Sequence, residues 1–342
     1  YRGIYYYDVV DMNGNNYADA AELAGKSPGN WYGLDINNPG NVSEPIHSVG
    51  DYKTPLTHEL QLGIDRELMT NFGLSGTFTW RNFTNFNWRN NPELVGTNYV
   101  QSGTLEGSQA PIGSYSTPIY VATRVPANRA ATVFRTRDGY SQRYLGFELA
   151  ATKRLSNRWM ARFGFSTNDH REYFDSPAAM GDPTPTPNSP NKDGGHVIVQ
   201  SSGSGKSGIY QVLPRYQFVA TGMYQAFWGI NLAGNMVTRQ GFSTPYFRNL
   251  VPTADPISRN KTVLLVDDVA EHRLPAVTSL DLRVGKEFGI QRLRVNVDID
   301  VFNALNSATV LGRQYNLRLT TADQVLEIMN PRVLRLGLRV NF

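Results

Sequence analysis

The sequence predicts an all-β chain whose antiparallel strands run up and down as a transmembrane β-barrel, with short periplasmic turns and long extracellular loops. Three observations predict this fold. Segments of about ten residues alternate apolar and polar side chains, which is the period of a strand. Short turns and long loops alternate along the chain. The polar side of the strands also carries more charge than a dry core tolerates, so water on that side is expected.

The clearest alternation lies in the last eleven residues, 332–342. One parity holds leucine, valine and the terminal phenylalanine, whereas the other holds Arg335 and Arg339. Because successive side chains of a strand point to opposite faces, this strand has an apolar face and a basic face. A soluble sandwich could turn the apolar face to its core, and a membrane barrel could turn it to lipid.

The same alternation recurs in four pairs of segments, each pair joined by a tight turn. The pairs are Thr57–Leu68 with Phe72–Arg81, Arg143–Leu155 with Arg158–Asn168, Arg215–Gln225 with Gly229–Arg239, and Thr278–Phe288 with Arg292–Asn303. Long polar segments separate the pairs, whereas an immunoglobulin-type sandwich would mix loop lengths at both ends. With the closing strand and a further strand expected in residues 1–8, about ten strands follow. They could close a narrow barrel or form part of a wider one, because strand number sets barrel diameter.

The inner parity of the last strands is strongly charged. Its members are Asp281, Arg283, Glu287, Arg294, Asp298, Asp300, Arg335 and Arg339. These charges either line a solute path or form salt-bridged ladders that hold a plug. Opposite charges interleave on the neighbouring segments 278–288 and 292–303, which favours the ladders.

Composition excludes several classes of protein. The chain has 342 residues, no cysteine and a net charge of +4 without a long basic run, so a disulfide framework and nucleic-acid binding have no support. No segment reaches the ~20 consecutive apolar residues of a membrane helix. No nucleophile, base and orienting group recur at useful spacing, so an enzyme is not expected.

Three segments resemble TonB-dependent outer-membrane receptors, particularly their Oar-like branch. Residues 298–306 (Asp-Ile-Asp-Val-Phe-Asn-Ala-Leu-Asn) are similar to a strand-and-loop signature near the end of that family, and Thr57–Arg66 is similar to a mid-barrel strand. The terminal Leu-Gly-Leu-Arg-Val-Asn-Phe, ending at Phe342, looks like the signal that the barrel assembly machinery recognises. The resemblance implies a 22-strand barrel with an amino-terminal plug, driven by TonB from the periplasm.

The chain departs from that family pattern at its front, where no plug, TonB-contacting segment or first half of the barrel is found. We therefore expect residues 1–342 to be the carboxyl-terminal portion of one barrel domain, with residues 1–56 as an extracellular loop. The resemblance implies uptake of an unidentified ligand across the outer membrane of a Gram-negative-type bacterium. The partners implied are membrane lipid and, through the missing plug, TonB. A passive porin and a structural or adhesive surface barrel stay open as alternatives.

One short motif has the spacing of a calcium loop of the EF-hand type. Oxygen donors fall at positions 1, 3, 5, 7, 9 and 12 of a twelve-residue segment, the pattern that a hard cation with six to eight oxygen ligands requires. Asn16 replaces the usual glycine at position 6. An asparagine-rich turn without an ion is the alternative. The predicted ligands are Asp11, Asn13, Asn15, Asp19 and Glu22 through their side chains, and Tyr17 through its carbonyl.

Overall fold

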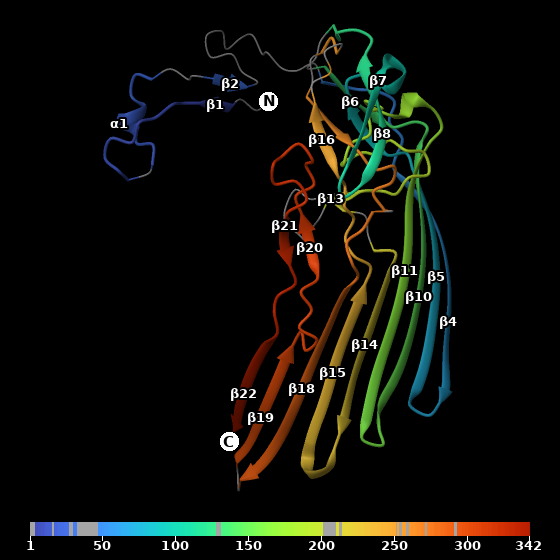
Figure 1. The fold of residues 1–342 in the computed structure, drawn as a ribbon, viewed down its shortest axis with the longest axis vertical. Coiled ribbons are helices and arrows are strands. Elements are labelled where there is room, and N and C mark those ends of the chain that lie inside the picture. The colour runs from blue at the N-terminus through green and yellow to red at the C-terminus, as the bar shows by residue number, and fades with distance from the viewer. Residues whose placement is uncertain are drawn as a thin grey trace.

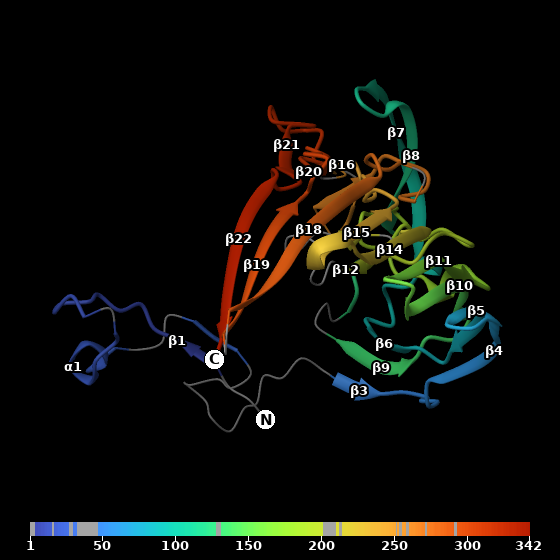
Figure 2. The same cartoon turned by 90° about the horizontal axis from the view of Figure 1, so that it is seen from below.

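A tall, curved antiparallel sheet forms one wall of the molecule, and a layer of loops and short strands covers one end of it (Figures 1 and 2). The computed structural model describes residues 4–15, 17–26, 30–32, 47–127, 131–200, 210–211, 214–250, 252, 255–257, 260–270, 272–290 and 293–342. Within these residues the wall holds nine strands, and each pairs with its neighbour along the chain among the wall strands. The predicted up-and-down antiparallel arrangement is therefore confirmed.

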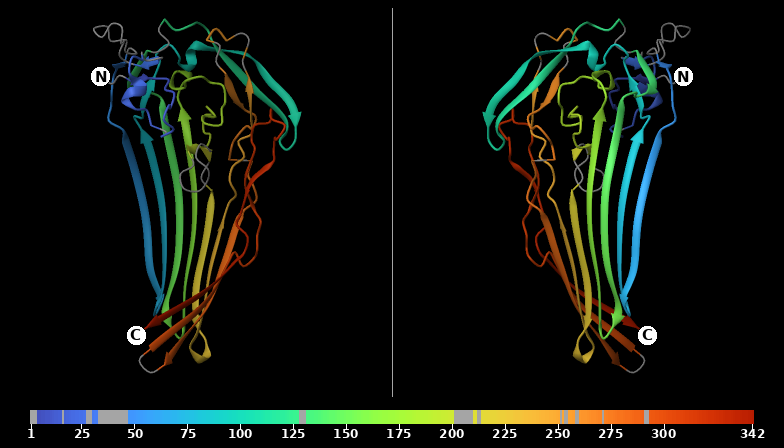
Figure 3. Two further views of the ribbon diagram at one scale, coloured as in Figure 1. Left: turned by 90° about the vertical axis from the view of Figure 1, so that its left-hand side faces the viewer. Right: turned by 90° about the vertical axis from the view of Figure 1, so that its right-hand side faces the viewer.

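All four predicted pairs and the closing strand are present in the wall. Along the chain its strands are β4 (Leu56–Met69), β5 (Phe72–Thr84), β10 (Tyr140–Ser156), β11 (Trp159–Phe174), β14 (Tyr216–Gln225), β15 (Ile230–Arg239), β18 (Val277–Ile290), β19 (Leu293–Phe302) and β22 (Val333–Asn341). The short turns all lie at the end of the wall opposite the loop layer (Figures 1 and 3). The expected separation of short turns from long loops is confirmed.

Residues with left-handed backbone reverse the chain at the short turns. Asn71 has a φ of 66° between β4 and β5, and Asn157 has a φ of 50° between β10 and β11. Asparagine adopts this conformation more readily than most residues, which suits a two-residue turn. The turn between β14 and β15 places Trp228 at a φ of 58°, and the indole is 84% exposed.

The strand register joins the apolar parities into one surface. Ile64 lies opposite Gly76, which in turn lies opposite Leu149. Leu149 lies opposite Phe165, and Phe165 lies opposite Phe218. Directly paired residues share a face of an antiparallel sheet, so the apolar side continues across the wall. A matching row crosses the other half of the wall through Leu232, Val284, Ile299 and Leu336.

The apolar face is more exposed than the polar face, which inverts the order of a soluble protein. Ile299 is 41% exposed and Leu336 is 74% exposed, whereas the neighbouring Asp300 is only 6% exposed. Side chains on the concave side of a curved sheet crowd together, and those on the convex side spread apart. The exposures therefore place the charged parity on the concave side of the arc seen in Figure 2.

The amino-terminal segment departs from expectation. Residues 1–8 were expected to add a tenth strand to the wall, but β1 (Ile4–Tyr6) pairs with β2 (Asn30–Tyr32) in a separate two-stranded sheet. The strand is three residues long and finds its partner locally, around the segment that contains the short helix α1 (Ala20–Leu23). No helix among the described residues has the length and apolar character needed to cross a membrane.

The loop layer contains the hydrophobic core of the molecule. Its largest buried apolar cluster gathers Tyr115, Tyr246, Leu264, Val269 and Leu317 from segments far apart in the sequence. Among the described residues, the buried apolar side chains of the wall strands are Tyr140 and Phe174, which lie at the loop ends of β10 and β11. The layer's strands are β3 (His47–Val49), β6 (Asn87–Asn90), β7 (Tyr99–Gln109), β8 (Gly113–Ala122), β9 (Thr132–Thr136), β12 (Val199–Gln200), β13 (Tyr210–Gln211), β16 (Phe247–Leu250), β17 (Lys261–Leu264), β20 (Val310–Arg313) and β21 (Val325–Ile328).

Candidate functional site

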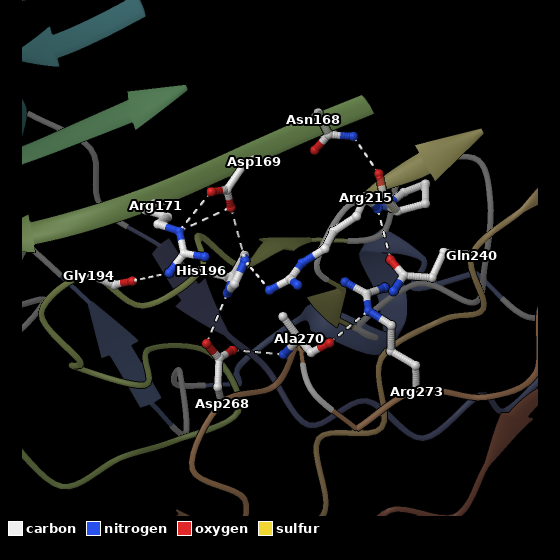
Figure 4. A network of polar contacts seen from close by, with 11 residues as sticks. Asn168, Asp169, Arg171, Gly194, His196, Arg215, Gln240, Asp268, Ala270 and Arg273 are labelled. Carbon is white, nitrogen blue, oxygen red and sulfur yellow. Dashed lines mark hydrogen bonds and ion pairs between the residues drawn. The ribbon is translucent and has the colours of Figure 1, made fainter. Parts of the chain in front are cut away.

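A buried histidine joins the loop end of β11 to two other segments. His196 is 2% exposed. Its Nδ1 lies 2.9 Å from Oδ2 of Asp268, and its Nε2 lies 3.1 Å from Oδ1 of Asp169. The same Nε2 lies 3.0 Å from Nη2 of Arg215 (Figure 4). Asp169 belongs to β11, Arg215 precedes β14 and Asp268 follows β17, so the ring holds three segments together.

The protonation state of His196 decides which neighbour its Nε2 bonds. A neutral imidazole protonated at Nδ1 donates to Asp268 and accepts a hydrogen bond from Arg215. An imidazolium donates from both nitrogens, to Asp268 and to Asp169.

Arginine and backbone groups complete this network. Burial raises the pKa of Asp268, but hydrogen bonds from His196 and from the amide of Ala270 outweigh burial and hold that pKa below its usual value. Nε of Arg273 donates to the carbonyl of Ala270 at 2.9 Å. Burial and then repulsion from Arg215 lower the pKa of Arg273 to about 10, so this guanidinium stays charged at neutral pH.

A second group of side chains, here named the mouth cluster, lies on the polar face at the loop end of the wall. The register places Tyr144 opposite His170, on the same parity as Glu148 and Ser166 lower down. The mouth cluster comprises Arg81, Tyr140, Tyr144, His170 and Glu172 of the wall, together with Arg137, which precedes β10 and lies over the Tyr140 ring.

An aromatic box encloses an arginine in the mouth cluster. The guanidinium of Arg137 lies 3.9 Å from the ring centroid of Tyr140 and 5.0 Å from that of Trp88. The Tyr140 hydroxyl donates to Oε2 of Glu172 at 2.9 Å. In the described part of the chain, Oε1 of Glu172 is buried without a hydrogen-bond partner. Cation–π contacts and the tyrosine–carboxylate bond therefore hold the box together.

Tyr144 forms the more open part of the mouth cluster. Its ring lies over Gly146, where an added Cβ would come within 2.5 Å of the tyrosine hydroxyl. The Arg81 guanidinium lies 5.6 Å from the Tyr144 ring, and its Nε donates to Oε2 of Glu59 at 2.5 Å. The ring of His170 meets Tyr144 edge-on at 6.0 Å. Aromatic surface and charges of both signs are thus available to a ligand.

Several charges on the polar face of β18, β19 and β22 form ion pairs across the strands. Asp300 lies between two arginines, 2.8 Å from Nε of Arg283 and 2.8 Å from Nη2 of Arg335. Arg283 also lies 3.7 Å from Asp298. The interleaved pairing predicted across these strands is confirmed. Whether the ladder holds a plug stays a prediction.

Several predicted calcium ligands lie close together. The side-chain Nδ2 atoms of Asn13 and Asn15 lie 2.6 and 2.9 Å from Oδ2 of Asp19. Oδ1 of Asp11 accepts hydrogen bonds from the backbone amides of Asn13 and Gly14. The loop therefore brings the side chains of Asn13 and Asn15 to Asp19 and closes on itself.

Two predicted side-chain ligands, Glu22 and Asn15, accept hydrogen bonds from backbone amides instead. The carboxylate of Glu22 accepts from the amides of Met12 and Asp19, at 2.8 and 3.0 Å, and these hydrogen bonds lower the pKa of Glu22. The amide of Tyr17 donates to Oδ1 of Asn15. Among the described residues, no group of three or more histidine, cysteine, aspartate or glutamate side chains is placed to hold a metal ion. Calcium binding by this loop stays a prediction.

The sequence reasoning assigned no role to the His196 network. His196, Asp169, Arg215 and Asp268 are spread over about a hundred residues, and no short motif connects them. One signal was present, because the apolar parity of β11 changes from phenylalanine to Asp169 and then Arg171. A change of this kind marks the level at which a strand leaves an apolar environment.

Comparison with known proteins gives structural likeness alone. No protein-family model matches the sequence. No curated protein matches it. The fold is similar to those of outer-membrane transporters. One of these is the FrpB iron transporter from Neisseria meningitidis, which is 13% identical over 86% of this chain and 31% of its own, with a TM-score of 0.41.

Two further solved structures show the same degree of likeness. FpvA from P. aeruginosa, solved with heterologous pyoverdines, is 12% identical over 82% of this chain and 26% of its own, with a TM-score of 0.45. The outer membrane transporter YddB from Escherichia coli is 12% identical over 86% of this chain and 34% of its own, with a TM-score of 0.41. The chain thus spans about a third or less of the length of each.

Proposed function

We propose that this chain forms the carboxyl-terminal wall of a TonB-dependent outer-membrane receptor that takes up an unidentified ligand. The supporting observation is the inverted exposure of the wall, on which Leu336 is 74% exposed and Asp300 is 6% exposed. Burying a leucine side chain is worth ~1.5–3 kcal/mol, so a protein in water covers such a surface. Rows of exposed apolar side chains across the described wall fit a surrounding of lipid.

The open edges of the sheet support completion by further strands. β4 and β22 lie at the two edges of the wall in the described residues, and neither edge is paired with the other. Unpaired backbone groups in lipid cost several kcal/mol each, so a spanning sheet must close into a barrel. The plug, the contact with TonB and the recognition of Phe342 by the assembly machinery all belong to this proposal.

Within the proposal, the mouth cluster is the part of this chain that contacts the ligand. It lies on the polar face at the loop end and offers the Tyr144 ring together with Arg81. Tyr144→Ala in the full-length receptor should weaken ligand binding, whereas Arg294→Gln, on the same face toward the turn end, should leave binding unchanged. Equal effects of the two changes would remove the mouth cluster from ligand binding.

Single cysteines can test which face meets lipid, because the chain has no cysteine of its own. Leu149 and Glu148 are consecutive in β10 and lie on opposite faces. A bimane label on Leu149→Cys of the full-length protein in vesicles should be quenched by brominated lipid. The same label on Glu148→Cys should be quenched by iodide in water. Quenching of both labels by iodide alone would contradict membrane insertion.

Transport measurements separate the proposal from its alternatives. A TonB-dependent receptor supports growth on a scarce nutrient only while TonB and the proton-motive force are intact. A passive porin would conduct ions in a planar bilayer without either. An adhesive barrel would show neither activity and would still insert in vesicles. Growth that is unaffected by loss of TonB would contradict the proposed mechanism.

A further inference from the structure

A groove lies where the apolar face of the wall ends and the loop layer begins. Its volume is 340 Å³, and β5, β10 and β11 form most of it. Its outward-facing side chains share the parity of the apolar rows, and the groove is distinct from the mouth cluster, which lies on the polar face. We name it the rim groove, and it is lined by Phe78, Leu145, Gly146, Phe147, Thr167, Asn168, Asp169, Arg171 and Arg215.

The two ends of the rim groove differ in chemistry. At the lower end Phe78 and Phe147 lie opposite each other and are 39% and 41% exposed. At the upper end the groove is lined by Arg171 and Arg215. Thr167 lies between the two ends, opposite Phe147. The rim groove therefore runs from an apolar surface at its lower end to a cationic surface at its upper end.

The upper end has an excess of positive charge. Nε of Arg171 bonds both oxygens of Asp169, at 3.1 and 2.9 Å, and Nη1 of Arg171 bonds the carbonyl of Gly194. Asp169 also contacts His196 at 3.1 Å. Arg215 is exposed, and its guanidinium contacts the Nε2 of His196. Of the charged side chains that line the groove, one is a carboxylate and two are guanidinium groups, so an anion near Arg215 would be attracted.

We propose that the rim groove binds an anionic membrane lipid, whose acyl chain lies against Phe78 and Phe147 and whose phosphate headgroup contacts Arg215 and Arg171. This inference rests on the proposed membrane function. A lipid fits because the occupant needs an apolar chain joined to an anion, and the apolar end continues the face that meets hydrocarbon. Guanidinium groups bind phosphate through paired, charge-assisted hydrogen bonds.

Native mass spectrometry of the full-length protein, released from vesicles of phosphatidylglycerol and phosphatidylcholine, tests the site. The wild type should retain phosphatidylglycerol in preference to phosphatidylcholine. Arg215→Gln should lower that retention about fivefold, the equivalent of ~1 kcal/mol per arginine near a lipid headgroup. Arg294→Gln is the matched control, because Arg294 is exposed on the opposite face and should have no effect.

A second variant acts without changing any charge. Thr167→Trp fills the middle of the rim groove with a side chain suited to the membrane surface, and it should also lower retention of phosphatidylglycerol. Equal retention of the two lipids by the wild type, or unchanged retention in both variants, would overturn the lipid site. A protein that salt and urea wash off the vesicles would instead overturn the proposed membrane function.

Discussion

Placing an arginine on the apolar face gives the most direct energetic test of the wall. Leu149 lies near the middle of β10, opposite Gly76 and Phe165, and is 39% exposed. An arginine near the bilayer midplane of a barrel costs ~2–4 kcal/mol. At ~1.4 kcal/mol per factor of ten, Leu149→Arg should lower the folding equilibrium constant roughly 30- to 700-fold. The same change on a surface in water would alter stability by only about 0.5 kcal/mol.

Denaturant titration of the full-length protein folded in lipid vesicles measures this cost. Glu148→Arg provides the matched control, because it adds the same residue to the same strand on the polar face. The control should cost less than ~1 kcal/mol, since its side chain stays in water. Equal losses of stability for the two variants, or a loss within about 0.5 kcal/mol for Leu149→Arg, would refute the assignment of the apolar face to lipid.

Three further predictions follow from the polar contacts. Asp300→Ala removes the carboxylate that lies between Arg283 and Arg335, so the unfolding midpoint should fall. Adding Arg335→Ala should restore part of the loss, and independent effects in this double-mutant cycle would exclude the ladder. Isothermal titration of the protein with calcium should show heat from binding to the loop at residues 11–22, and Glu22→Ala should abolish that heat. The absence of heat in the parent protein would contradict calcium binding by this loop. The pKa of Asp268 is lowered in the folded state, so its ionised form stabilises the fold at any pH above its unfolded pKa of ~3.9. That stabilisation is lost as the pH falls through the folded pKa. Asp268→Asn should therefore weaken the acid-induced rise in hydrogen exchange of residues 191–198; an unchanged acid response would contradict this.

The wall was predictable from the sequence because its signal is local and repeated. Alternation at period two identifies a strand wherever one face meets an apolar environment and the other meets water, and it places the turns between strands. The first eight residues show the limit of that signal. Their aromatic side chains suggested a wall strand, but β1 pairs with β2 because a partner nearby in the chain was available.

Local sequence patterns specify which residues form the wall, which parity is apolar and at which end the long loops lie. Which individual charges meet depends on strand register and on loops that return from distant positions, so it follows from the folded arrangement. Asp300 lies directly opposite Arg335 through strand pairing, and His196 reaches Asp268 through loop packing. Strand periodicity is encoded by neighbouring residues, whereas contacts between loops depend on the whole fold. The His196 network and the rim groove therefore had no counterpart in the sequence pattern.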